Sequence, residues 1–416
     1  MIEAGERLLA GRFVVDREVG RGGVGIVYLA RDEVSGQAVA LKVIAVPGVS
    51  AGEEARFLRE GRVLAGLRHP SIVRVVAFGQ LDDGQPFIAM EWLEGEDLAK
   101  REQRAPLGLV PCLLVAADVA DALAAAHEEG VVHRDVKPSN IFLCGSAQGA
   151  SGGFQVKLVD FGVAAAQDAK LTRTGAIIGT PAYMAPEQAR GDGSADARAD
   201  LYALGATLFE MITGRPPHVG PTPIAILAKL VTTPAPRLAN VFVNAPARLD
   251  DLMARLLATV PSDRPAAAED VASELRGIAA ELGAGDGDAL KRGEGRGSFP
   301  AADKAGGTRL VTTIVATHLP KGTPRARLLT HLRARGADAT ELGGDAIVCH
   351  LGVRKALGNE ALHALDLGLR IAKLDASVGV ATGRTRIEHT RPTGEVVDRA
   401  AALARDAPRG QVLADT

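Results

Sequence analysis

One stretch of nine residues constrains this chain more than any other. It reads Val132-His133-Arg134-Asp135-Val136-Lys137-Pro138-Ser139-Asn140, and Asp160-Phe161-Gly162 follows after a short variable segment. A carboxylate that can take a hydroxyl proton, a lysine, and an amide and a second carboxylate that can bind a divalent metal therefore fall in one compact region. Phosphoryl transfer requires this set of groups, so we expect the preceding residues to hold a nucleotide over them.

Upstream, short apolar runs separated by glycine-rich or polar turns predict an antiparallel meander over residues 13–41. The turn between its first two strands has the spacing G-x-G-x-x-G-x-V, formed by Gly20, Gly22, Gly23, Gly25 and Val27. Glycines let backbone N–H groups approach phosphates closely. A dinucleotide-binding fingerprint is similar but must open a helix, whereas Ile26 to Leu29 continues as a strand. This context favours a flap over a nucleotide.

The next strand ends in Val39-Ala40-Leu41-Lys42, which places Lys42 on an inward-facing position behind the flap. An isolated lysine of this kind is more often solvated, and the glycine loop before it favours a phosphate-binding role instead. A helix predicted over residues 53–67 carries Glu60, which we expect to orient Lys42 toward the α- and β-phosphates. A solvated helix glutamate is the alternative, and the rival partners are Glu53 and Glu54.

Two more strands are predicted, over residues 72–78 and 86–90, before the segment 91–95. That segment resembles a hinge whose backbone groups, at Glu91 and Leu93, hold an adenine ring. Helical periodicity then begins, with a long apolar helix over residues 113–127. The chain therefore passes from a small β-rich lobe to a helical lobe, and the cleft between the lobes is the expected ligand site.

The residues of the central stretch have distinct expected roles. Asp135 would accept or steer the proton of the substrate hydroxyl, and Lys137 would neutralise charge on the moving γ-phosphoryl group. Asn140 and Asp160 would bind magnesium. Each residue alone could be a loop-capping residue, but the five-residue step from Asp135 to Asn140 makes the set specific. Val136 departs from the leucine usual at its position, and a branched apolar side chain should still pack there.

The ordered set from about Arg12 to Leu282 resembles a eukaryotic-type Ser/Thr protein kinase of the kind found in bacteria. The resemblance rests on the glycine loop, Val39-Ala40-Leu41-Lys42, Glu60, His133-Arg134-Asp135, Asp160-Phe161-Gly162 and Ala185-Pro186-Glu187. It implies a bilobal α+β fold, with a β-rich N-lobe and a helical C-lobe, that uses ATP and Mg²⁺ to phosphorylate a protein substrate. Lys137 and the run Gly179-Thr180-Pro181-Ala182-Tyr183 resemble the Ser/Thr-specific pattern. The glycine loop, Val27, Ala40 and Lys42 would contact the nucleotide.

Two further matches to this family are structural. Asp200 resembles the helix aspartate that braces the catalytic loop. Arg264 in Asp263-Arg264-Pro265 resembles the buried arginine that pairs with Glu187.

The segment after Asp160 carries candidate phosphorylation residues, Thr172 and Thr174. A phosphate on either could be gripped by Arg134 and order the segment, so activity should rise with autophosphorylation. A solvated loop is the alternative reading. Thr180 is a weaker candidate because it is expected to contact Asp135 and Lys137 directly.

Apolar periodicity stops over residues 284–307, where Gly, Asp, Lys and Arg predict a flexible linker between a kinase domain (1–283) and a second domain (308–416). Beyond the linker a small α+β sheet domain is predicted. Its strands and helices are expected over residues 309–316, 326–336, 339–351, 357–374 and 376–381.

This second domain resembles, more weakly, a class III adenylate/guanylate cyclase domain with a ferredoxin-like α+β fold, incomplete at residue 416. The resemblance lies in residues 343–348, 378–383, 394–403 and 410–413. Asp345 could supply one metal-binding carboxylate of that family, but Thr317 occupies the position of the other. Asp398 and Ala402 replace the family's asparagine and arginine, which removes charge stabilisation of a phosphate. We therefore expect no cyclic-nucleotide synthesis and a homodimer through this domain that brings two kinase lobes together.

Length and composition agree with this reading. A chain of 416 residues predicts two or more domains, and a net charge of −2 gives no broad basic field for nucleic acid. Three lone cysteines, Cys112, Cys144 and Cys349, fit a reducing compartment and argue against disulfides or zinc. The N-terminus lacks a signal-peptide pattern, and the apolar stretch 107–127 carries two aspartates, so a cytoplasmic protein without a membrane anchor is expected.

Two rival functions remain. A signalling scaffold would bind nucleotide without transferring phosphate, and a bifunctional enzyme would also cyclise a nucleotide. The presence of Lys42, Asp135, Asn140 and Asp160 together argues against the scaffold.

Overall fold

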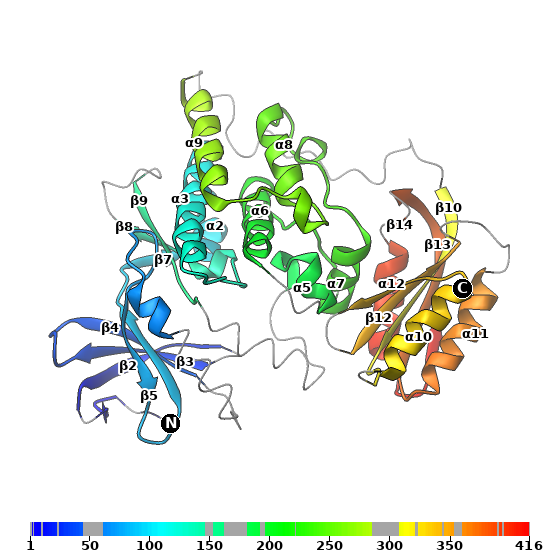
Figure 1. Cartoon of the computed structure of the whole chain (residues 1–416), viewed down its shortest axis with the longest axis horizontal. Coiled ribbons are helices and arrows are strands. Elements are labelled where there is room, and N and C mark those ends of the chain that lie inside the picture. The colour runs from blue at the N-terminus through cyan, green and yellow to red at the C-terminus, as the bar shows by residue number, and fades with distance from the viewer. Residues whose placement is uncertain are drawn as a thin grey trace. The chain divides into compact units, whose positions relative to one another are not determined.

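Contacts in the computed structural model divide the chain into two units. Figure 1 shows their helices and strands, coloured by residue number. Met1–Ala169, Asp196–Ile212 and Pro265–Glu294 form the first, and Lys170–Ala195, Thr213–Arg264 and Gly295–Thr416 form the second. The structure describes residues 2, 4–9, 11–22, 25–44, 61–145, 153–161, 181–191, 196–220, 222–284, 308–320, 323–342, 345–352, 360–388, 391–392 and 395–415.

The first unit begins with an antiparallel sheet in the order β1-β2-β3-β4-β6-β5. Its strands are β1 (Arg7–Leu8), β2 (Phe13–Gly22), β3 (Gly25–Asp32), β4 (Ala38–Ile44), β5 (Val75–Gln80) and β6 (Pro86–Glu91). The predicted meander is therefore present as β2, β3 and β4. Alternating apolar residues bury one face, where the rings of Phe13 and Phe87 meet edge to face at 6.1 Å.

Beyond this sheet the first unit is largely helical. The described helices are α2 (Leu98–Arg104), α3 (Leu109–Glu128), α6 (Ala197–Thr213, the last residue of which falls in the second unit) and α9 (Ala268–Ala284). A short sheet of β7 (Gly95–Asp97), β8 (Ile141–Gly145) and β9 (Phe154–Leu158) lies beside them, with a 3₁₀ turn, η1 (Pro138–Asn140), before β8. The β-rich and helical halves of the predicted kinase fold are thus both present.

Helix α3 is the long apolar helix that the sequence predicts. It is the one helix among the described residues whose length and composition would allow it to cross a membrane, and 61% of its most apolar window is buried inside the protein. Helix α9 packs along it, and the Arg276 guanidinium binds Asp118 (3.0 Å) and Asp121 (3.2 Å) on α3. A core helix with these partners satisfies the same length and composition test.

The second unit begins with short helices. They are η2 (Pro181–Tyr183), α5 (Pro186–Arg190), α7 (Pro223–Thr232), η3 (Leu238–Asn240), α8 (Ala247–Leu256) and η4 (Pro261–Asp263). Helix α7 begins with Pro223 in its first turn, and the Thr222 hydroxyl caps it by accepting from the Ala225 N–H at 3.1 Å.

The same unit contains a sheet in the order β11-β12-β10-β13-β14, with β15 parallel to β13. Its elements are β10 (Thr308–Thr317), α10 (Thr323–Ala334), β11 (Asp338–Leu342), β12 (Ala346–Leu351), α11 (Glu360–Ala372), β13 (Ser377–Glu388), β14 (Arg391–Pro392), α12 (Glu395–Asp406) and β15 (Val412–Ala414). The α+β elements predicted after residue 308 are present, although β13 continues to Glu388 instead of ending at residue 381.

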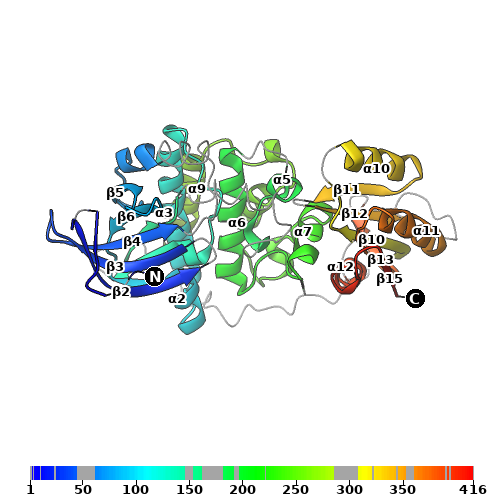
Figure 2. The ribbon, with the colours of Figure 1, turned by 90° about the horizontal axis from the view of Figure 1, so that it is seen from below.

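Helices cover both faces of this sheet (Figure 2). Val378 and Val380 of β13 join the apolar core with α10 and α11, so Gly379 between them faces the opposite side. There α12 lies directly on the strand, because a Cβ at Gly379 would approach the Ala400 carbonyl oxygen to 2.1 Å. Only glycine permits this close approach of helix and strand.

Candidate active site

Lys42 lies at the centre of the N-terminal sheet. On β4 it pairs with Val27 of β3 on one side and with Ile88 of β6 on the other. Its side chain is 10% exposed, and Nζ donates to Oδ1 of Asp160 at 2.7 Å. The two residues are 118 positions apart in the chain, so the fold brings together two residues that the sequence assigned to phosphate and metal.

Several predicted site residues lie outside the described part of the chain. They are Gly23, Glu60, Gly162, Thr172, Thr174 and Thr180. The expected pairing of Lys42 with Glu60 thus stays a prediction.

The other nucleotide-binding candidates belong to β2, β3 and β4. Val27, Ala40 and Lys42 share one face of the sheet, because Val27 is directly opposite Lys42 and Ala40 is two residues earlier on the same strand. The glycine loop is the hairpin between β2 and β3. A Cβ at Gly25 would lie 2.1 Å from the Val43 carbonyl oxygen, whereas nothing lies within 4 Å of a Cβ at Gly20. Gly25 therefore has a packing requirement of its own.

Asp160 occupies the left-handed backbone region, with φ of 65°. A non-glycine residue there is strained and needs its neighbours to hold it. His133 supplies two of these contacts: its Nε2 hydrogen-bonds the Val159 carbonyl oxygen at 2.9 Å, and its ring meets the edge of Phe161 at 4.5 Å. His133 is fully buried.

The hydrogen bonds of His133 also settle its tautomer. The Asp135 N–H donates to Nδ1 at 3.2 Å, so Nδ1 is the acceptor and Nε2 carries the proton that is donated to Val159. The His133 imidazole thus joins the backbone of Asp135 to Val159, the residue before Asp160. The sequence does not predict the contact between His133 and Val159, because the two residues are 26 positions apart.

Asp135, Lys137 and Asn140 meet within hydrogen-bonding distance. Oδ2 of Asp135 accepts from Nζ of Lys137 at 2.7 Å and from Nδ2 of Asn140 at 3.1 Å. The same Asn140 amide donates to the Asp135 backbone oxygen at 2.8 Å, which leaves the Asn140 side-chain oxygen facing elsewhere. The side chains of Asp135 and Lys137 are 30% and 24% exposed, so a substrate can reach them.

Asp200 of α6 holds the backbone of this loop. Its fully buried carboxylate accepts from the N–H groups of His133 (2.8 Å) and Arg134 (2.7 Å), and Nε2 of His127 lies 2.8 Å from it. Arg134 also has a left-handed φ of 65°. Three donors converge on a single carboxylate and hold this strained turn in place. His127 was missed from the sequence because 73 residues separate it from Asp200.

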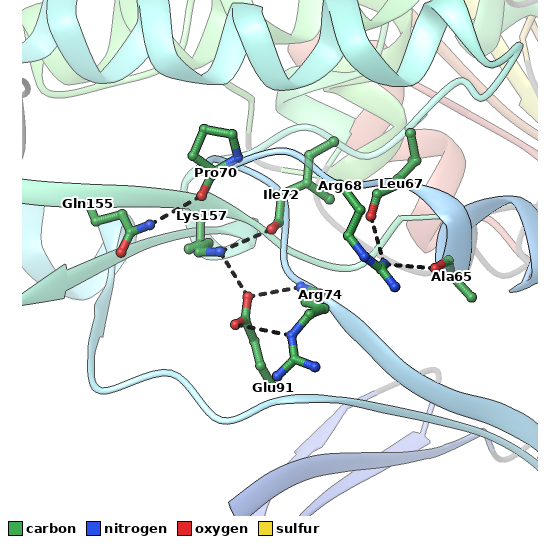
Figure 3. Close-up of polar contacts among 9 residues, drawn as sticks. All are labelled: Ala65, Leu67, Arg68, Pro70, Ile72, Arg74, Glu91, Gln155 and Lys157. Atoms are coloured by element: carbon green, nitrogen blue, oxygen red, sulfur yellow. Dashed lines mark hydrogen bonds and ion pairs between the residues drawn. The ribbon is translucent and has the colours of Figure 1, made fainter. Parts of the chain in front are cut away.

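The hinge residue Glu91 directs its side chain into a polar cluster (Figure 3). Oε1 accepts from Nζ of Lys157 at 2.8 Å and from the Arg74 N–H at 2.9 Å, while Lys157 also donates to the Ile72 carbonyl oxygen at 3.2 Å. Burial would raise the pKa of Glu91, but the hydrogen bonds from Lys157 and Arg74 outweigh it and lower that pKa. A nucleotide contact by Glu91 is therefore left to its backbone. Leu93 is half-buried between β6 and β7.

A cavity of about 20 Å³ adjoins the Lys42–Asp160 pair. The two charged side chains form its polar end, and apolar side chains form the rest: Leu64, Ile72, Val73, Val75, Ile88, Met90 and Phe161. This volume holds about one water molecule, so the cavity itself is too small for a nucleotide.

In the second unit, Arg264 and Glu187 form the ion pair that the sequence expects. Nη1 and Nη2 of Arg264 donate to the two carboxylate oxygens at 2.7 and 2.8 Å, and Nε donates to the Ala258 carbonyl oxygen at 2.9 Å. The side chains are 0% and 8% exposed. A two-pronged pair of this kind fixes orientation as well as charge.

In the C-terminal sheet the end of β10 lies beside Asp345, because the Leu319 N–H donates to the Asp345 carbonyl oxygen at 2.9 Å. Thr317 is buried, and its hydroxyl lies 3.2 Å from Nδ1 of His318. Across the described residues, no group of three or more His, Cys, Asp or Glu side chains is arranged to hold a metal ion. Asp398 pairs with Lys229 of α7 at 2.7 Å, a contact that the sequence did not predict.

The three cysteines are free, as predicted, with Cys112 and Cys349 buried. Burial raises the pKa of the Cys349 thiol to about 12, so this thiol stays protonated at neutral pH. Cys349 is therefore a small apolar packing residue.

Known proteins resemble this chain over its first two thirds. The family model described as "Protein kinase domain" matches residues 13–275. The Serine/threonine-protein kinase PknL of Mycobacterium tuberculosis is 38% identical over 68% of this chain and 71% of its own length. Serine/threonine-protein kinase pkn2 of Myxococcus xanthus is 36% identical over 68% of this chain and 34% of its own. The crystal structure of the Mycobacterium tuberculosis PknI kinase domain superposes with a TM-score of 0.53 at 32% identity, covering 67% of this chain and 99% of that structure.

Proposed function

Because this chain belongs to the protein kinase family and is a bacterial eukaryotic-type Ser/Thr protein kinase, we propose that Asp135, Lys137, Asn140 and Asp160 carry out its phosphoryl transfer. ATP is the proposed phosphoryl donor, and a serine or threonine hydroxyl of a protein is the acceptor. The observation that carries this proposal is the meeting of Asp135, Lys137 and Asn140 at one hydrogen-bonded centre.

The donor atoms suit magnesium. Asp160 offers a carboxylate that is 30% exposed, and Asn140 offers the side-chain oxygen that its bonds to Asp135 leave over. Hard oxygen donors of this kind are those that Mg²⁺ prefers. When bound, the metal would neutralise charge on the phosphate oxygens. Lys42, held at 2.7 Å from Asp160, would bind the α- and β-phosphates next to it.

The remaining steps belong to the side chains. Asp135 would accept a hydrogen bond from the substrate hydroxyl and then take its proton. At the same time the hydroxyl oxygen forms a bond to the γ-phosphorus, and the bond between that phosphorus and the β–γ bridging oxygen breaks, which releases ADP. Lys137, already bonded to Asp135, would offset the negative charge that develops on the transferred group. His133 and Asp200 would act as positioning residues, since both are fully buried and hydrogen-bond the backbone of the loop.

For the nucleotide, we propose the face of the N-terminal sheet that carries Val27, Ala40 and Lys42 as one wall. Gly20, Gly22, Gly23 and Gly25 would cover the phosphates, and the backbone at Glu91 and Leu93 would contact the adenine. The ion pair between the Glu91 side chain and Lys157 supports the proposed adenine contact, because it holds Glu91 in place while leaving its backbone groups to bind the ring.

For regulation, we propose that phosphorylation of Thr172 or Thr174 activates the enzyme through Arg134. The proposed location is the cytoplasm. We further propose that residues 308–416 form a degenerate cyclase-type domain that makes no cyclic nucleotide. The separation of this domain from a kinase domain at 1–283 by the linker 284–307 is part of the same proposal.

A nucleotide-binding scaffold is the rival function, and one variant separates the two. Lys137→Ala removes a charge that acts during transfer while leaving Lys42 and the glycine loop in place. We expect it to bind ATP as the wild type does and to lose most transfer to an added protein substrate. Equal and negligible transfer by wild type and variant, with ATP bound by both, would instead support the scaffold.

A further inference from the structure

A charged contact joins the kinase lobe to the C-terminal sheet region within the second unit. Nζ of Lys229, on α7, donates to Oδ2 of Asp398, on α12, at 2.7 Å. The two residues are 169 positions apart, on either side of the predicted linker. Helices α7 and α12 also pack against each other, and β11 contacts both α7 and α5.

The pair is largely withdrawn from water. The Lys229 and Asp398 side chains are 15% and 23% exposed, and Nζ makes a second bond to the Val219 carbonyl oxygen at 2.8 Å. Oδ1 of Asp398 is buried and has no hydrogen-bond partner among the described residues. The Asp398 carboxylate therefore depends on Lys229 for its compensation, because a buried charge without a partner is strongly unfavourable.

A second charged group next to Lys229 is energetically unfavourable, as the pKa of His218 shows. His218 is fully buried near the end of the preceding loop, and burial together with the Lys229 ammonium lowers its pKa to about 4. His218 is thus neutral at physiological pH and cannot replace Lys229 as a partner for Asp398. Among the described residues around this contact, Lys229 is the cation bonded to Asp398.

The helices that carry the two partners, α7 and α12, each pack against other elements of the second unit. Helix α7 buries Ala225, Leu227, Ala228, Leu230 and Val231, and it contacts η2 and α5. Helix α12 lies against β13 at Gly379. The pair therefore joins two helices that are each packed against other elements of the second unit.

We propose that the C-terminal region, residues 308–416, is a docking module for its own kinase lobe, with Asp398 of α12 recognising Lys229 of α7. The contact of β11 with α5 extends the docked surface to the helix that carries Glu187. Docking in this way braces the elements that follow the candidate phosphorylation segment. It uses charge complementarity and does not depend on any catalytic role of the C-terminal region.

Hydrogen–deuterium exchange on the full-length chain tests this directly. Asp398→Lys and Lys229→Asp should each raise exchange of the amides of α7 about tenfold, because each variant places like charges face to face. The swapped double variant, Lys229→Asp with Asp398→Lys, should restore protection. Asp406→Lys is the matched control: it makes the same charge change on α12, at an exposed residue paired with Arg405. It should leave α7 unchanged.

Several outcomes would overturn the proposal. Unchanged α7 exchange in both single variants, or an equal rise in the Asp406→Lys control, would show that the pair does not hold the two regions together. Restored protection on mixing the two single variants would show that the contact forms between two copies and not within one chain. If a reversal variant fails to fold, Asp398→Asn provides the same comparison with a smaller change. Exchange is read on the protein itself, so the result is independent of kinase activity.

Discussion

Among single residues, buried His218 makes the stability of the folded protein depend on pH. Its pKa falls from an ordinary 6.5 to about 4 in the folded protein. Between these values the unfolded chain binds a proton that the folded protein does not, so stability is full above pH 6.5 and is lost as pH falls toward 4. The difference corresponds to about 3 kcal/mol.

We therefore expect His218→Gln to flatten the fall of the unfolding free energy between pH 6.5 and pH 4, measured by urea denaturation. His69, whose pKa is also lowered by burial, should leave a smaller residual slope. An undiminished slope in the variant would show that another group carries the effect.

Two glycines of the β2–β3 hairpin separate nucleotide contact from packing. Gly20→Ala meets no atom within 4 Å, so it should leave the melting temperature unchanged and raise KM for ATP several-fold by holding the loop off the phosphates. Gly25→Ala drives a Cβ into the Val43 carbonyl and should lower the melting temperature as well. Steady-state kinetics and thermal melts of both variants distinguish the two effects. A Gly20→Ala enzyme with wild-type KM would remove that glycine from the nucleotide site.

The residues that could be found from the sequence are those whose chemistry depends on spacing along the chain. Asp135, Lys137 and Asn140 fall within six positions, so a local pattern identifies them. His127, Lys157 and Lys229 each act on a carboxylate 66 or more positions away, and only the fold brings such pairs together. Asp398 illustrates the same limit. The sequence shows only that an aspartate replaces the asparagine of the cyclase family at this position, whereas the structure pairs its carboxylate with Lys229 on α7.

At the scale of elements, the Arg264–Glu187 pair ties α5 to the turn before α9. Removing one partner of a buried pair leaves the other charge uncompensated, at a cost of roughly 3–5 kcal/mol. Glu187→Ala should therefore lower the unfolding free energy by about this amount, measured by urea denaturation with Asp406→Ala as the control. Asp406 also pairs with an arginine, Arg405, but the two side chains are 59% and 53% exposed. Equal, small losses in both variants would contradict a structural role for the buried pair.

Elements with strong periodicity were predictable, and their limits were less so. The β2–β4 meander and α3 follow from period-2 and helical spacing of apolar residues. The extension of β13 to Glu388 was missed because its last residues, Arg384 to Glu388, are mostly polar. Pairing with β10, up to Thr308 opposite Arg386, sustains the strand where the apolar pattern ends.

At the scale of the whole molecule, we propose that α11 mediates the homodimer. Leu362 and Leu369 are 71% and 52% exposed and lie seven residues apart, so they share one face of this helix. Asp366 and Arg370 lie beside them on the same helix and pair with each other at 2.9 Å, so they add no unpaired charge to this face. This face is distinct from α12, which contacts α7.

Leu362→Glu with Leu369→Glu should therefore convert a dimer to a monomer in sedimentation equilibrium. Phosphorylation of an added substrate should persist, while autophosphorylation should become more sensitive to dilution. Deletion of residues 308–416 should have the same two kinetic effects. A wild-type chain that sediments as a monomer at high concentration would contradict the dimer.

We propose that phosphoryl transfer by this chain depends on Asp135 and Asp160. Both residues can be tested by measuring transfer from labelled ATP to a generic protein substrate, with magnesium, by wild type, Asp135→Asn and Asp160→Ala at saturating ATP. We expect metal-dependent transfer by the wild type and loss of nearly all of it in both variants, with circular dichroism spectra that match the wild type. Transfer at near wild-type rate by either folded variant would show that the substituted residue does not carry out the reaction.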